Sequence, residues 1–332
     1  MTQATVPSPG TVPSSGTVPS GTITSPPPVR ETRSRRAAQR AGSSRPSVLA
    51  EGERPSRGAR IAAWIFMGAI TLYFLVPVYW LIVASTKSTA ELFSTPGFTF
   101  ANINLVENLV DLSSYNGGIF WRWMGNSMIY SGLGSIAMTF ICLISGYALA
   151  MYRFKGRTLV LGAVLGSMLI PQTVLAQPTY LLLVELGLNN TIWGILLPSL
   201  AYPFGVLLAF VFAQSAVPME LLEAARLDGA SEWRAFFSIA LKLLSPGGVT
   251  ILLFAFIGSW NNFMLPLLVL SDARLQPVTV GLSGWSQASI TIPGLQTLVV
   301  IGSLVSIIPI IVVFVSLQRY WKTGLAAGGV RF

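Results

Sequence analysis

The 332-residue sequence contains no histidine and a single cysteine, Cys142, which lies inside an apolar run. An internal disulfide, a Cys/His metal site and histidine-based acid–base or nucleophilic catalysis are therefore excluded. No lysine directly follows a glycine, so the phosphate-binding loop G-x-x-x-x-G-K-[ST] is missing as well. We expect a chain that is not an enzyme and binds no metal or cofactor; if ATP drives it, a partner chain hydrolyses the ATP.

Charged residues are scarce, at 10% of the chain against about 25% in soluble domains, while 52% of residues are apolar. This composition excludes an ordinary soluble enzyme. The net charge of +9 would suit a nucleic-acid partner, but nine of the 21 basic residues precede residue 61, directly ahead of the first apolar segment. Retention of a membrane protein's tail in the cytoplasm explains that location better, and we expect no nucleic-acid partner.

Residues 1–60 differ in composition from the rest of the chain. Thr-Val-Pro-Ser occurs three times in them, and an Arg/Ser-rich run follows Pro26-Pro27-Pro28. Such a segment buries too little apolar surface to offset the entropy lost on ordering. The sequence therefore predicts a disordered cytoplasmic tail over 1–60, ahead of a folded membrane domain over 61–332.

Six apolar segments follow the tail, each near the ~20 residues that cross a bilayer as a helix. The connections place 18 Lys and Arg residues on the side of the two termini and three on the other side. By the positive-inside rule both termini lie in the cytoplasm. We predict an all-α protein of the cell membrane, embedded in the lipid bilayer, with six transmembrane helices: 61–84, 127–150, 159–184, 192–213, 249–270 and 295–317.

No Asp, Glu, Lys or Arg falls inside these six segments, which argues against a self-sufficient ion-coupled carrier. The segments do contain proline breaks and side-chain amides. Amides can donate and accept hydrogen bonds, so they suit a hydroxyl-rich neutral solute. They can equally join one helix to another. The candidates for a solute path are Gln172, Gln177, Asn261 and Asn262.

The connection 214–248 is long and helical in character. Pro218 suits the start of a helix, Gly229 its left-handed end, and Ser231 the cap of a second helix. Ala224 and Ala225 leave one flank small enough for the close approach of another protein. The alternative is an amphipathic helix that lies against its own bundle.

These residues resemble the EAA loop of ABC importer permeases. The matching positions are Glu223-Ala224-Ala225, Gly229, and Ile239-Ala-Leu241, although Lys242 stands where the family has proline. Further stretches, including Leu169-Ile-Pro171 and Trp260-Asn-Asn-Phe-Met-Leu-Pro266, are similar to maltose-type sugar permeases of the MalG-like kind. The resemblance covers about residues 61–332.

The resemblance implies a type I ABC importer permease fold and a set of partners. These are a second homologous permease subunit, two ATPase subunits, and an extracytoplasmic binding protein that delivers a sugar, expected to be a di- or oligosaccharide. It places the contact with the ATPase at Glu223, Ala224, Ala225, Asp228 and Gly229. The small, flexible segment after the last span, with Gly324 and Gly328, either reaches the ATPase as well or is a frayed terminus.

Two other functions stay open at this point. One is a self-contained secondary carrier or channel, which would transport without an ATPase. The other is an ABC permease for a solute that is not a sugar.

Overall fold

The computed structural model describes residues 57–328, with the backbone alone over 321–328. The chain divides into two units between Ile65 and Phe66. Of the described residues, the first unit contains only the start of α2, and the packing described here is that of the second unit. The predicted tail 1–60 lies outside the described residues except for its last four, which belong to α2. The helices at the beginning of the described chain are α2 (Arg57–Ser85), α3 (Thr89–Ser94), α4 (Leu105–Ser114), the 3-10 turn η1 (Tyr115–Gly118) and α5 (Ile119–Met151).

The remaining elements are helical as well, and residues 57–328 contain no β-strand. They are α6 (Arg157–Ser167), α7 (Gln172–Glu185), α8 (Trp193–Ser199), α9 (Pro203–Ala216), α10 (Met219–Leu227), α11 (Glu232–Ala235), the π-turn η2 (Phe236–Ala240), α12 (Leu241–Trp260), α13 (Met264–Val269), α14 (Val278–Ala288) and α15 (Leu295–Gly328).

Five helical stretches within the described residues are long and apolar enough to cross a membrane, and one of them, Trp193–Ala216, comprises α8 and α9. The pair α6 and α7 meets the same criterion together, with a bend of 104° between them. The prediction of an all-α membrane protein is confirmed, and six spans result when this pair is counted as one.

The single helix predicted over 159–184 is wrong in detail, because residues 168–171 interrupt it. Pro171 disfavours helical backbone in the residue before it and serves as the N-cap of α7. The predicted fifth segment is divided in the same way: α12 ends at Trp260, and α13 begins after the break that contains Asn261 and Asn262. The predicted fourth segment, 192–213, is divided as well, because residues 200–202 separate α8 from α9. A proline lies in or within three residues of each of the three breaks.

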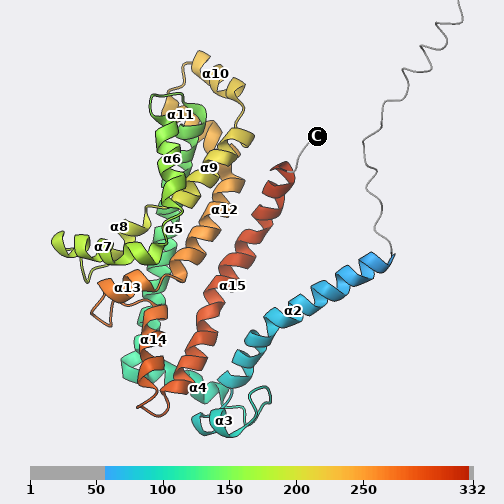
Figure 1. Cartoon of the computed structure of the whole chain (residues 1–332), viewed down its shortest axis with the longest axis vertical. Helices are drawn as coiled ribbons and strands as arrows, with labels where there is room; N and C mark the ends of the chain where they lie inside the picture. Colours follow the sequence, from blue (N-terminus) through green and yellow to red (C-terminus); the bar gives the residue numbers. More distant parts are fainter. Residues whose placement is uncertain (1–56, 329–332) are drawn as a thin grey trace, which may run out of the picture. The chain divides into compact units, whose positions relative to one another are not determined.

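The helices α5, α9 and α12 pack side by side as the centre of the bundle, with α15 against α12 (Figure 1). Small residues allow this proximity. A side chain on Gly146 of α5 would lie 2.4 Å from Cβ of Ala209, and Cys142, one turn earlier, is fully buried. Such close contacts between small residues are the usual basis of helix association in membranes.

The bundle has two distinct ends (Figure 1). The α10 end carries α10 and α11, which connect α9 to α12. At the α14 end, side chains of α5 hold the chain that precedes α14. Trp123 Nε1 donates to the carbonyl of Ala273 at 2.7 Å, and the Tyr130 hydroxyl donates to that of Leu275 at 2.7 Å.

Candidate functional site

The predicted coupling segment forms two short helices at the α10 end. Pro218 is the N-cap of α10 and not its first helical residue, so the helix starts one position later than expected. Glu220 lies in its first turn, where the helix dipole favours a carboxylate. Ser231 caps α11, and its hydroxyl accepts a hydrogen bond from the Arg234 amide at 3.3 Å. The predicted helix–glycine–helix arrangement is confirmed.

Gly229 ends α10 with a left-handed backbone, at φ +79°. Its amide donates to the carbonyl of Arg226 at 3.0 Å, and the Ala230 amide donates to that of Ala225 at 2.9 Å. This pair of bonds is the Schellman motif, which satisfies the last carbonyls of a helix. Nothing lies within 4 Å of a side chain added at Gly229, so the backbone conformation alone accounts for the glycine.

The two faces of α10 differ. Leu222 and Ala225, three positions apart, share the face that is buried against the chain's own helices. Glu223, Ala224, Asp228 and Gly229 are exposed. Of the two alanines in the predicted contact only Ala224 is exposed, because the helical period turns Ala225 toward its own bundle.

Large apolar side chains lie exposed around α10. Leu227 is 90% exposed and Trp233 64%, and Leu221 is exposed as well. Phe236, by contrast, is buried and anchors the segment in the core formed with α5, α9 and α12. The segment thus combines a buried anchor with an exposed apolar and acidic surface, which is typical of an interaction site.

An ion pair and a hydrogen bond connect this segment internally and to α5. Arg226 Nε donates to Glu232 Oε1 at 2.8 Å, and Arg226 Nη2 donates to Glu232 Oε2 at 3.2 Å. Glu232 Oε2 also accepts a hydrogen bond from the hydroxyl of Tyr152, the residue that follows α5. Burial, and then the Glu232 carboxylate, raise the pKa of Tyr152 above its ordinary value. This connection could not be predicted from the sequence, because Tyr152 and Glu232 are 80 positions apart and no local pattern indicates their contact.

The candidates for a solute path lie on α7 and around the break between α12 and α13. Gln172, Gln177 and Asn261 are exposed, and α7 packs against α13. The Asn261 amide donates to the carbonyl of Ile257 in its own helix at 2.9 Å. Among the residues that the structure describes, no hydrogen bond joins the four candidates to one another. The fold thus brings α7 and α13 together, while the side chains of Gln172 and Gln177 form no hydrogen bond with each other.

Asn190 holds the loop between α7 and α8 against the chain that follows α13. Its Oδ1 accepts from the amides of Ser271 at 3.1 Å and Asp272 at 2.9 Å. Its own amide donates to the carbonyl of Val269 at 2.8 Å. The sequence analysis did not single out this residue, although asparagine in a Gly-Leu-Asn-Asn turn is a recognisable signal for left-handed backbone, here at φ 54°.

The segment with Gly324 and Gly328 continues α15. The helix runs through both glycines, and their contact with the ATPase stays a prediction.

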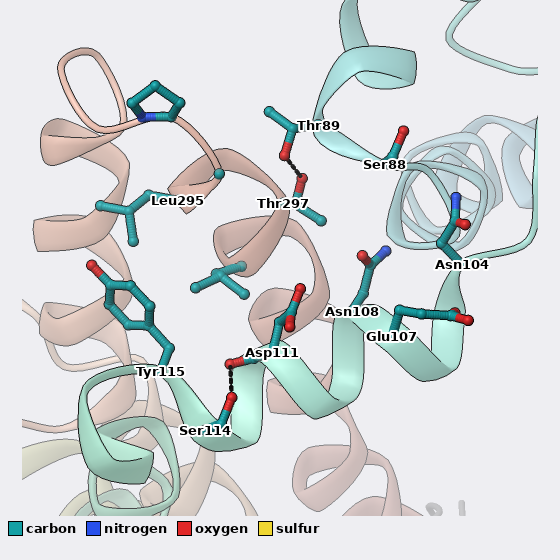
Figure 2. A pocket seen from close by; sticks show the side chains of 13 residues that line it. Ser88, Thr89, Asn104, Glu107, Asn108, Asp111, Ser114, Tyr115, Leu295 and Thr297 are labelled. Carbon is teal, nitrogen blue, oxygen red and sulfur yellow. Dashed lines mark hydrogen bonds between the residues drawn. The ribbon is translucent and has the colours of Figure 1, made fainter.

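A hollow of about 420 Å³ lies between α4 and the start of α15 (Figure 2). Glu107 and Asp111, one turn apart on α4, line it together with hydroxyl groups, and Thr89 and Thr297 form a hydrogen bond of 2.8 Å at its edge. Asn108 of α4 is buried, and its side-chain amide donates to the carbonyl of Ser85, the last residue of α2, and to that of Lys87. The α14 end therefore also presents a polar, acidic concavity.

Comparisons with known proteins agree with this architecture. Residues 142–325 match the family described as "Binding-protein-dependent transport system inner membrane component". The arabinooligosaccharides transport system permease protein AraQ of Bacillus subtilis is 32% identical over 281 residues, which cover 82% of this chain and 96% of AraQ. The sn-glycerol-3-phosphate transport system permease protein UgpE of Brucella abortus is 29% identical and covers 79% of this chain and 93% of UgpE.

A solved structure shares the fold. It is a bacterial ABC transporter involved in the import of the acidic polysaccharide alginate, and its matching chain superposes with a TM-score of 0.69 at 24% identity. The match covers 80% of this chain and 99% of that chain.

The protein is a multi-pass membrane subunit of a transport system. It belongs to the family of binding-protein-dependent transport system inner membrane components, the permeases of ABC importers. The resemblance stated from the sequence is confirmed.

Proposed function

We propose that this permease imports a sugar, expected to be a di- or oligosaccharide, which an extracytoplasmic binding protein delivers. Membership of the permease family carries the proposal. AraQ and the alginate importer are named for carbohydrates, and UgpE for a phosphorylated polyol, so the solutes in these names are rich in hydroxyl groups. The predicted spans contain no Lys or Arg that would pair with a phosphate, which favours the neutral sugar over a charged solute.

We infer that residues 61–332 form the permease domain. Within it, the segment 214–248 is the site that the ATPase subunits contact. Hydrolysis belongs to two ATPase subunits that assemble with this chain and a second, homologous permease. Exposed Glu223, Ala224, Asp228 and Gly229 provide the contact surface, and Leu227 and Trp233 add apolar area beside it. Closure of the ATPases would then displace α10 and shift the helices between two states of access, a coupling that both partners bias.

The orientation of the chain follows from its basic residues. Arg226, Arg234 and Lys242 belong to the segment of α10, on the side where the positive-inside rule places both termini. The α10 end is accordingly cytoplasmic and the α14 end extracytoplasmic. On this orientation α15 extends Gly324 and Gly328 toward the ATPases, and the acidic hollow faces the binding protein.

We propose that the solute path runs past the break between α6 and α7 and the break between α12 and α13. Irregular backbone at membrane depth is tolerated where it is buried in protein or lines a cavity. Gln172, Gln177, Asn261 and Asn262 lie at or beside those breaks, and their amides can pair with sugar hydroxyls.

The decisive experiment is purification of the complex in mild detergent, with mass spectrometry of its subunits and uptake assays in proteoliposomes. We expect an ATPase and a second permease to copurify, and uptake of oligosaccharide to require ATP. Purification of the chain alone, with transport in the absence of ATP, would identify a secondary carrier.

Glu223→Ala tests the contact surface. Loss of one hydrogen bond to a charged group costs about 1.5–3 kcal/mol, so ATPase association and uptake should fall about tenfold or more. Glu185→Ala, which removes an exposed carboxylate at the end of α7, is the matched control and should change neither. Equal uptake by the two variants would contradict the placement of the contact.

A further inference from the structure

A short non-helical joint connects α10 to its neighbours at each end. Toward α9 the backbone passes through Val217 and Pro218, both extended. Toward α11 it passes through the left-handed Gly229. A rod held at two joints can still turn about the line between them. The face formed by Leu222 and Ala225 opposes such turning only through non-directional packing.

The Arg226–Glu232 pair supplies a third, directional point. Arg226 is in the last turn of α10, and both of its contacts reach Glu232 across the glycine joint, at 2.8 and 3.2 Å. A guanidinium that meets both oxygens of a carboxylate fixes their relative orientation more strictly than a single bond does. The pair therefore restrains the rotation that the two joints leave open.

Tyr152 extends this restraint to α5. Its hydroxyl donates to Glu232 Oε2, and its ring packs edge-on against Tyr147 with centroids 5.9 Å apart. Tyr147 in turn contacts Phe236, with centroids 5.1 Å apart. A tyrosine hydroxyl is protonated at neutral pH, and burial and the carboxylate raise the pKa of Tyr152 further, so it remains a donor.

We propose that Tyr152, Glu232 and Arg226 are positioning residues that fix α10 relative to the end of α5. A displacement of α10 is then passed to α5 and is not absorbed by rotation at Gly229. This inference rests on the proposed docking of an ATPase at α10. Its observable consequence is the amount of solute moved for each ATP hydrolysed.

The role is distinguishable from a contribution to folding. The Arg226 and Glu232 side chains are 36% and 49% exposed, and ion pairs of that exposure add little to stability. Their removal should therefore leave insertion and assembly of the complex intact.

The test compares Tyr152→Phe and Glu232→Gln in the complete complex, reconstituted in proteoliposomes with the binding protein. Both variants preserve the size of the side chain and remove one element of the contact. We expect assembly and ATP hydrolysis to stay near the wild-type level, while solute transported per ATP falls about fivefold, the lower end of typical coupling energies. Arg234→Gln is the control, since Arg234 lies on α11 and makes no ion pair with the described residues; it should leave the ratio unchanged.

A charge exchange adds a second test. Arg226→Glu and Glu232→Arg should each lower transport per ATP, and the double variant should recover part of the wild-type ratio, because the ion pair is restored and the arginine at position 232 can donate to the Tyr152 oxygen. An unchanged ratio in Tyr152→Phe and Glu232→Gln would overturn the inference. So would a loss of ATPase binding that accompanies the loss of transport in every variant, because that result assigns the residues to docking. Failure of the wild-type chain to bind an ATPase at all would instead refute the proposed function.

Discussion

The contact between α5 and α9 allows a quantitative prediction for Gly146→Ala. The new methyl group would lie 2.4 Å from Cβ of Ala209 and 2.6 Å from the backbone nitrogen of Phe210. Carbon atoms pack at about 3.5–4.0 Å, so α9 must move away by roughly 1 Å. Two of the three nearest atoms belong to the backbone, and no rotation of a flexible side chain can relieve the clash.

The expected cost follows from two opposing effects. Overpacking of a tightly packed interior costs about 1–3 kcal/mol. Alanine favours the helix over glycine by about 1 kcal/mol, which offsets part of that cost. We therefore expect Gly146→Ala to lower the free energy of unfolding by up to about 2 kcal/mol, through separation of α5 from α9.

Gly132→Ala is the matched control in the same helix. Nothing lies within 4 Å of a side chain built at Gly132, so the substitution should be neutral or stabilise by up to about 1 kcal/mol. The measurement is unfolding of the purified complex in detergent, followed by helical circular dichroism, for wild type and both variants. Equal stability of the two variants would refute the close contact between α5 and α9.

Two further predictions concern the α14 end and the loop between α7 and α8. Hydrogen bonds from Ser88 hold the pKa of Glu91 at about 2, below its ordinary 4.5. A group whose pKa is lowered in the folded state contributes stability that is present above pH 4.5 and is lost as the pH falls toward 2. Glu91→Gln cannot titrate, so it should remove that part of the acid sensitivity in an unfolding series from pH 6 to pH 2.5. Asn190→Ala leaves the amides of Ser271 and Asp272 without their acceptor and should cost about 1–3 kcal/mol, while Asn190→Asp keeps an acceptor oxygen and should cost less in the same unfolding assay. Equal losses in the two Asn190 variants would contradict the role of the acceptor.

Much of the fold could be predicted from the sequence because the bilayer simplifies the problem. Long apolar segments must be helical at membrane depth, and Gly229 and Ser231 mark helix ends by local backbone chemistry. The effect of each proline was harder to predict. Pro171 opens a helix after a sharp bend, whereas Pro178 lies inside α7 without interrupting it. Whether a freed carbonyl finds another partner depends on tertiary contacts, which no local pattern contains.

The candidate site shows the same division between local and tertiary information. The pattern around Glu223 locates the segment, yet only the period of the folded helix shows that Ala224 is exposed and Ala225 buried. The contact of Tyr152 with Glu232 depends on how α5 ends beside α11, 80 positions away. Sequence alone therefore predicts the helix–glycine–helix segment that is proposed to contact an ATPase, and not which of its side chains face outward.

The long helix α5 connects the two ends at which partners are proposed to act. Its 33 residues span about 50 Å, and it packs against both α9 and α12. Trp123 and Tyr130 near its start hold the chain ahead of α14, while Tyr152 just after its end contacts Glu232. The irregular backbone lies instead at the breaks between α6 and α7, between α8 and α9, and between α12 and α13. A rod with directional contacts at both ends, beside helices that are broken, can transmit displacement of α10 along the bundle while the path changes shape at the breaks.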